Sequence, residues 1–349
     1  MSQKKLLYEV SIIRPLVIFL LVVTHSMAFF NGGWKVPAGV EHVETYRWIS
    51  AFIAGFRIET IALVAGYVFA FQSIDLHRKY DFWPFARKKM KRLLVPALIF
   101  GTVYYFIFLY GRESFSWGGF LMKLLSGVGH LWFLPMLFWC FLCIWLIDRK
   151  QPSEKRLIAV LAVLSIIPIP IPLPFGFHRF FHFMFYCYAG YLLYAHREQV
   201  LAKLMNRKSI SSLALIYCTL VVIELTVISK IGGGKNNLST LSVLHFGLSY
   251  ANRFVYSCCG ILALYLFVCR FTTRAGFEPR QWVISASKYC YGVYVYHQFI
   301  MYYLYEHTPM PQHVGSWLIP VVGLLVTFPL SYLLTWLSLR SRIGRYLIG

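Results

Sequence analysis

An arginine and a histidine stand eleven residues apart in one apolar segment, SIIRPLVIFLLVVTHS at residues 11–26. In an α-helix, this spacing puts Arg14 and His25 about 20° apart on one face and roughly 16 Å apart along the axis. A guanidinium binds anionic groups such as phosphates, and a neutral imidazole can take a proton from a hydroxyl. The spacing predicts that both groups project from one face, toward opposite ends of the helix. The alternative is that Arg14 reaches the lipid headgroups and His25 satisfies a core hydrogen bond.

Other apolar segments also contain ionisable residues, each of which costs about 2.5–3.5 kcal/mol at mid-membrane on insertion scales. Arg57 and Glu59 are two residues apart and cannot pair on one helix face, so each needs a partner elsewhere. Glu224 is a candidate partner for Arg57 or for a histidine. We take as supporting or acceptor-side candidates Arg57, Glu59, His130, Glu224, Tyr291 and His297.

A run of basic residues enters the third apolar segment in the loop FWPFARKKMKRLLVP, residues 82–96. We expect Arg87, Lys88, Lys91 and Arg92 to bind a polyanionic ligand at the membrane face where Arg14 also emerges. The alternative is that these cations only fix the topology and bind anionic lipid.

The composition indicates which elements position these residues. Of 349 residues, 58% are hydrophobic and 13% are charged, about half the charged fraction of a soluble domain. The net charge of +21 does not indicate nucleic-acid binding, because the cations lie in short runs between apolar segments. The sequence predicts one all-α, polytopic membrane domain over residues 1–349, with no separate soluble domain.

Ten segments approach the roughly 20 residues that a bilayer requires. We expect spans at about 11–30, 48–72, 93–110, 130–147, 156–173, 179–196, 210–229, 251–269, 288–306 and 316–338. The fifth contains the helix-breaking IIPIPIPLPFG, and the connection at 230–250 is ambiguous. Of the 34 Lys and Arg residues, 24 fall in the two terminal segments and alternate connections and 8 in the other connections. This bias predicts a multi-pass protein of the cytoplasmic (inner) membrane with both termini in the cytoplasm.

The eight cysteines lie in or beside apolar segments. Cys140 and Cys143 form a C-x-x-C without a second pair, so we expect packing and no metal site. A signal peptide ending near residue 28 is an alternative to the first span, although the remaining chain is equally hydrophobic.

Taken together, these segments resemble the membrane acyltransferase-3 family, whose members O-acylate sugars and envelope polysaccharides. The resemblance extends over all the spans, and its most specific element is the R-x10-H of Arg14 and His25. It is supported in family order by the pair Gly66 and Tyr67, RKKMKRLLVP, HLWFL at 130–134 and YGVYVYHQ at 291–298. The chain departs from the family pattern at Arg57 and Glu59, where uncharged residues or proline are more usual.

The resemblance implies an O-acyltransferase that uses acyl-CoA, with acetyl-CoA the expected form, as co-substrate and holds no permanent cofactor. It implies that Arg14 and the cations at 87–92 bind the donor phosphates, and that His25 activates a hydroxyl of an envelope sugar or polysaccharide. Expected partners are the donor, the acceptor and membrane lipid, without nucleic acid. A homo-oligomer is compatible with the sequence.

Two other functions also explain buried charges and a basic inner face. One is a transporter or flippase for a charged lipid or sugar. The other is a non-catalytic membrane partner of a glycan-export complex, in which His25 would be replaceable.

Overall fold

The computed structural model describes residues 7–110, 115–167, 169, 173–229 and 240–349. The regular elements are helices, and no strand occurs among these described residues. In chain order they are α1 (Tyr8–Ser26), α2 (Glu44–Ala54), α3 (Arg57–Ile74), α4 (Phe82–Tyr104), the π-helix η1 (Tyr105–Leu109), α5 (Trp117–Ser126), the 3₁₀ helix η2 (Gly129–Trp132), α6 (Phe133–Lys150), α7 (Glu154–Ile166), the 3₁₀ helix η3 (Pro174–Arg179), α8 (Phe180–Ala195), α9 (Arg197–Leu204), α10 (Arg207–Ile223), the π-helix η4 (Glu224–Ile228), α12 (Thr240–Thr272), α13 (Gln281–Glu306), α14 (Met310–His313), α15 (Ile319–Arg340) and α16 (Arg342–Ile348).

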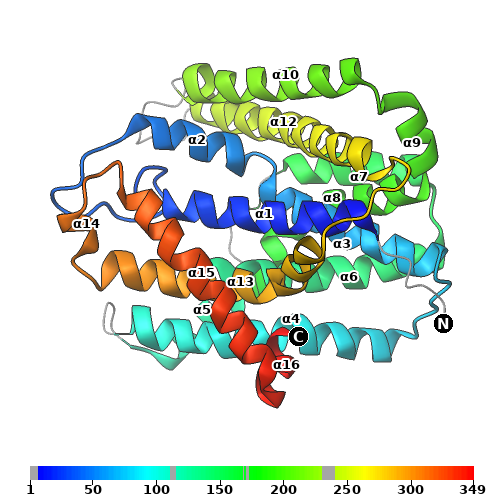
Figure 1. Cartoon of the computed structure of the whole chain (residues 1–349). Helices are drawn as coiled ribbons and strands as arrows, with labels where there is room; N and C mark the ends of the chain where they lie inside the picture. Colours follow the sequence, from blue (N-terminus) through cyan, green and yellow to red (C-terminus); the bar gives the residue numbers. More distant parts are fainter. Residues whose placement is uncertain (1–6, 111–114, 168, 170–172, 230–239) are drawn as a thin grey trace.

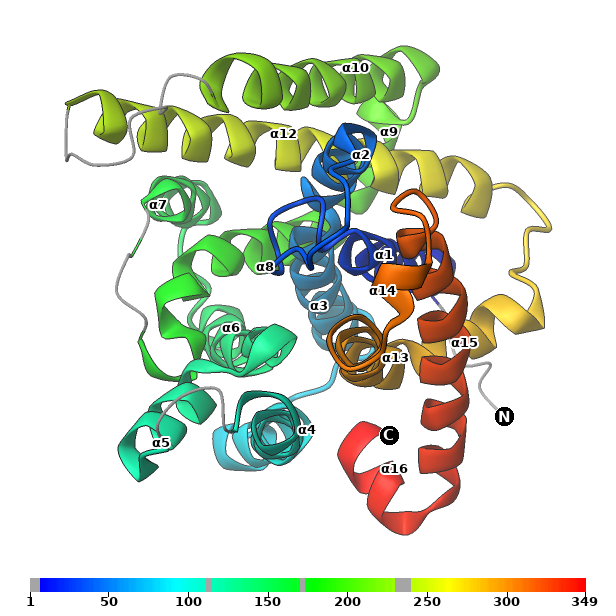
Figure 2. The ribbon, with the colours of Figure 1, turned by 90° about the vertical axis from the view of Figure 1, so that its left-hand side faces the viewer.

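The helix that carries Arg14 and His25 lies inside the bundle. Helix α1 contacts α2, α3, α12, α13 and α15, and both views show it surrounded by other helices (Figures 1 and 2). Figure 1 shows the start of α1 and the start of α4 on the same side of the bundle. Arg14 is therefore nearer that side, and His25 is at the opposite end of α1.

The all-α polytopic fold is confirmed. Seven helical segments are long and apolar enough to cross a membrane, counted over the described residues: Tyr8–Ser26, Glu44–Ile74, Phe82–Leu109, Gly129–Lys150, Arg207–Ile228, His245–Thr272 and Ile319–Arg340. Helices α7, α8 and α13 occupy the places of the predicted fifth, sixth and ninth spans but are not among the seven. The first two have only 13 and 16 residues, and α13 contains many tyrosines as well as His297 and Gln298.

Three predicted boundaries were wrong. The fifth segment was expected to reach residue 173, but α7 ends at Ile166, just before the proline-rich stretch that cannot continue a helix. Helix α12 begins at Thr240, eleven residues before the expected start of the eighth span. The basic stretch expected in a loop is helical, because α4 begins at Phe82. Lys, Arg and Met favour helix, and Pro84 is tolerated in the first turn.

The second span, expected to be one helix, is broken between α2 and α3 at Gly55 and Phe56. A break inside a membrane frees backbone groups that need other partners. The Tyr217 hydroxyl donates to the carbonyl of Phe52, and the Ser257 hydroxyl donates to the carbonyl of Gly55. Side chains of α10 and α12 thus stabilise the break, which makes Arg57 the first residue of α3.

Helices α3 and α8 approach closely through two glycines. A Cβ on Gly66 would overlap the backbone carbonyl of Cys187, and a Cβ on Gly190 would overlap the carbonyl of Leu63. Small residues at helix contacts allow membrane helices to pack backbone against backbone. This contact fixes the position of α3 and hence of its N-terminus.

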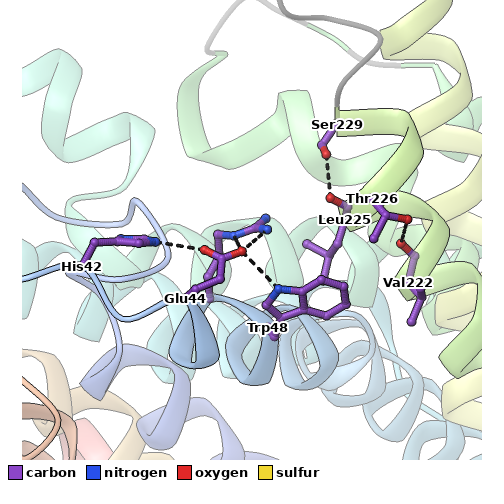
Figure 3. Close-up of polar contacts among 8 residues, drawn as sticks. His42, Glu44, Trp48, Val222, Leu225, Thr226 and Ser229 are labelled. Atoms are coloured by element: carbon purple, nitrogen blue, oxygen red, sulfur yellow. Dashed lines mark hydrogen bonds and ion pairs between the residues drawn. The ribbon is translucent and has the colours of Figure 1, made fainter.

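Polar side chains near one end of the bundle are satisfied locally (Figure 3). The hydroxyls of Thr226 in η4 and of Ser229, the residue after it, each donate, over 2.7 Å, to the carbonyl four residues earlier. At the start of α2, Glu44 accepts a hydrogen bond from the Trp48 indole at 3.1 Å. Each of these polar groups has a hydrogen-bond partner four residues away on the same helical segment. These hydrogen bonds therefore do not link different helices of the bundle.

Candidate active site

A cavity of about 260 Å³ opens beside the end of α1 that carries His25. Its wall combines the end of α1, the segment after it, the start of α3, η2 with the first residue of α6, and α13. The lining residues are Leu21, His25, Ala28, Asn31, Gly33, Trp34, Arg57, Ile58, Ile61, Gly129, His130, Trp132, Phe133, Tyr294 and Gln298. The structure therefore brings three of the predicted residues, His25, Arg57 and His130, to one cavity.

His25 and His297 form a hydrogen-bonded pair across 272 positions of sequence. Nδ1 of His25 lies 2.8 Å from Nε2 of His297, and the two rings are nearly parallel, with 16° between their planes. His297 is fully buried and does not line the cavity. It lies behind His25 and orients its ring.

The contacts of His297 determine which nitrogens carry protons. Nδ1 of His297 lies 2.7 Å from the carbonyl oxygen of Tyr294 and 3.2 Å from that of Val293. A carbonyl only accepts, so this Nδ1 carries hydrogen, and Nε2 of the neutral ring has the lone pair. His25 must then donate from Nδ1, which leaves the lone pair of its own Nε2 free. Because His25 lines the cavity, that lone pair can accept a proton from a hydroxyl placed there.

His130 is hydrogen-bonded to α13, the helix that contains His297. Its Nε2 lies 3.0 Å from the carbonyl oxygen of Val295 and donates to it, and the Tyr294 hydroxyl donates to the carbonyl of His130 over 2.5 Å. Nδ1 of His130 is therefore a lone-pair nitrogen, and it is buried without a hydrogen-bond partner. Helix α13 thus positions histidines from α1 and η2 at one cavity.

We expect His297→Leu to lower the turnover number of the predicted acyl transfer by on the order of 10²-fold, because the His25 ring would lose the partner that fixes its tautomer and orientation. His297→Gln should recover much of the loss, since the side-chain oxygen can accept from Nδ1 of His25. Steady-state kinetics on purified variants would check this, and the Michaelis constant for the donor should stay unchanged. Equal losses in both variants would mean that His297 serves only packing.

The predicted donor-side residues lie toward the other end of α1 and at the start of α4. Arg14 is half-buried and makes no ion pair or hydrogen bond within the described part of the chain. Arg92, which is exposed, is close enough for its charge to act on Arg14. The Tyr291 hydroxyl donates to the carbonyl of Arg92 over 2.7 Å. Tyr291, a supporting or acceptor-side candidate, thus lies beside Arg92, one of the predicted donor-binding residues, and nearly two helical turns from His297.

The basic run is divided by its helical conformation. Arg87, Lys88 and Lys91 line an open surface depression together with the exposed Trp83. Lys89 instead turns inward, with its ammonium 3.3 Å from the ring centroid of Phe141. Because residues of a helix point to different faces, Lys89 faces the interior while Arg87, Lys88 and Lys91 face the surface.

The two membrane-embedded glutamates lie outside the cavity lining. Glu224 accepts hydrogen bonds from Ser249 at 2.5 Å and Asn252 at 2.8 Å, so the expectation that it pairs with Arg57 or a histidine was wrong. Glu59 is buried and lies 3.6 Å from Nε2 of His182. Neither His182 nor Arg253, whose charge acts on Glu59, was predicted from the sequence. No spacing pattern links them, because they come from α8 and α12.

Comparison with known proteins tests the resemblance found in the sequence. The family model described as "Acyltransferase domain", that of the acyltransferase-3 family, matches residues 7–336, nearly the whole chain. The chain belongs to the acyltransferase-3 family. No curated protein and no solved structure matches this acyltransferase. It is a membrane-embedded enzyme that transfers acyl groups other than aminoacyl groups.

Proposed function

We propose that this acyltransferase moves an acyl group, in the simplest case acetyl, from acyl-CoA at the cytoplasmic face to a hydroxyl of a cell-envelope sugar or polysaccharide. The proposal rests mainly on the position of His25. This residue lines the cavity, its ring is oriented by the hydrogen bond to His297, and its Nε2 has a lone pair that can accept a proton. A thioester and a hydroxyl placed in that cavity are the two reactants that such a base would join.

In the proposed complex, the Arg14 end of α1 binds the nucleotide end of acyl-CoA, and the His25 end lies beside its acyl group. The nucleotide end of CoA carries phosphates, which charged hydrogen bonds from Arg14 and the exposed cations of α4 would bind. The pantetheine arm is uncharged and extended, and would follow the roughly 16 Å of α1 that separate Arg14 from His25. The acyl group would reach the cavity while the nucleotide stays at the basic face.

In the proposed reaction, the hydroxyl oxygen of the acceptor forms a bond to the thioester carbonyl carbon while its proton passes to Nε2 of His25. The tetrahedral intermediate then re-forms the carbonyl, and the bond between carbon and sulfur breaks. The CoA thiolate takes the proton back from His25, so the enzyme returns to its starting state. His297 accepts the Nδ1–H hydrogen bond of His25 throughout.

Changing Arg14 to Ala should raise the Michaelis constant for acetyl-CoA by roughly 10-fold or more, because a charged hydrogen bond to phosphate is lost. Acetyl-pantetheine lacks the nucleotide phosphates, so its Michaelis constant should change little. Measuring both constants for each variant separates donor binding from a general defect. Neutralising Arg87, Lys88 and Arg92 together should have the same selective effect.

Lys203→Ala is the matched control, since Lys203 is an exposed cation on α9 that we predict to lie on the same membrane face. It should leave both Michaelis constants unchanged. Equal changes for acetyl-CoA and acetyl-pantetheine in the Arg14 variant would show that Arg14 does not bind the phosphates.

A further inference from the structure

The break between α2 and α3 places a helix N-terminus in the cavity wall. Arg57 and Ile58, the first two residues of α3, both line the cavity. The first backbone bond of this helix runs from the N–H of Thr60 to the carbonyl of Phe56, so the N–H groups before it have no acceptor four residues earlier. Such an end carries a partial positive charge and favours a negative group.

The Arg57 side chain adds a full positive charge at the same place. Its Nε and Nη1 atoms are buried and have no hydrogen-bond partner. Arg57 makes no ion pair within the described part of the chain. The charge of Glu59 acts on Arg57, but the Glu59 carboxylate itself lies against His182. Burying an unpaired guanidinium is costly, so a fold that keeps one beside a cavity has donors available for a ligand with negative charge.

We propose that the Arg57 side chain, together with the backbone N–H groups of Arg57 and Ile58, binds the thioester carbonyl oxygen and stabilises the negative charge that develops on it. This inference rests on the proposed function. When the acceptor oxygen bonds to the carbonyl carbon, the π electron pair of the carbonyl moves onto its oxygen, and the hydroxyl proton moves to His25. When the intermediate collapses, that electron pair re-forms the carbonyl and the sulfur leaves with the electrons of the carbon–sulfur bond.

The arrangement explains why the second span is broken where it is. A continuous helix would hydrogen-bond the N–H groups of residues 57 and 58 internally and leave them no donor capacity for a ligand. Gly55 allows the close approach of Tyr217, whose ring atoms a Cβ would meet. Catalytic donors work best when they are fixed before the charge appears, and the packing around this break supplies that rigidity.

The test compares wild type, Arg57→Gln and Arg57→Lys in inside-out membrane vesicles that contain the native acceptor. CoA release from acetyl-CoA is measured with a thiol reagent. Removing one oxyanion donor typically lowers turnover by about 10²–10³-fold, and we expect that loss for Arg57→Gln with a Michaelis constant for acetyl-CoA within about 3-fold of wild type. Arg57→Lys, which keeps the charge, should lie between the two.

Arg253→Gln is the matched control, because it removes an exposed cation whose charge acts on Glu59 at a position that does not line the cavity. It should keep turnover within several-fold of wild type, and thermal unfolding of each purified variant should show that all three are folded. The inference is overturned if Arg57→Gln keeps near-normal turnover. It is also overturned if a larger amount of envelope glycan enclosed in the vesicles restores the rate of Arg57→Gln, since Arg57 would then bind the acceptor.

The same assay separates this inference from the proposed function. If the wild type releases no CoA above the level of His25→Gln, the proposed reaction itself is wrong. If the wild type releases CoA and Arg57→Gln does so equally well, only the role of Arg57 is wrong.

Discussion

His25→Gln is expected to lower acyl transfer by about 10²–10⁴-fold, the usual contribution of a general base, while folding and acyl-CoA binding stay close to wild type. Glutamine is polar and can keep a hydrogen bond to His297, but it cannot take up a proton near neutral pH. A sugar hydroxyl is a poor nucleophile without such help. The loss should therefore fall on turnover and spare the donor affinity.

The measurement is the rate of acyl transfer in membranes adjusted to equal amounts of each variant, with acetyl-CoA binding measured in parallel. His42→Gln is the control, because His42 is exposed and lies beside Glu44, outside the cavity. Near-normal transfer by His25→Gln would contradict the assignment of His25. The base would then be sought first at Nδ1 of His130, the other lone-pair nitrogen at the cavity.

The second large effect concerns stability. Gly66→Ala would place a methyl group on the carbonyl of Cys187, a backbone atom that cannot turn aside. Overpacking typically costs 1–3 kcal/mol and occasionally more, and here α3 and α8 must move apart to relieve it. We expect a marked fall in the thermal unfolding temperature and in the yield of monodisperse protein.

Gly247→Ala on α12 provides the comparison, since nothing lies within 4 Å of a Cβ built there. Alanine is favoured over glycine inside a helix by roughly 1 kcal/mol, so this variant should be as stable as the wild type or slightly more stable. Equal unfolding temperatures for the two variants would show that the close approach of α3 and α8 is not needed.

The sequence was sufficient to predict features that depend on local pattern. The apolar segments predicted the helical membrane fold, and the motif in the first span correctly indicated the family. His25, Arg57 and His130 were singled out individually because ionisable residues are costly inside a membrane. Each of these predictions needs only the residue type and a span boundary.

The pairing of side chains could not be predicted, because it depends on which helices are neighbours. His25 and His297 meet only because α1 packs on α13, and the tautomers follow from backbone carbonyls that no sequence pattern reveals. The break before Arg57 depends on hydroxyls of Tyr217 and Ser257 from distant helices. Glu224 was assigned the wrong partner because its actual partner Asn252 lies on α12.

Sidedness gives the most direct test of the central claim, that a donor held at the basic face reacts at His25 near the opposite face. Radiolabelled acetyl-CoA is added to sealed membrane vesicles of known orientation, and label on the envelope glycan is counted. The account predicts label in inside-out vesicles, where the cytoplasmic face is accessible, and none when these carry His25→Gln. Label in intact right-side-out vesicles, or equal label with the His25 variant, would contradict it.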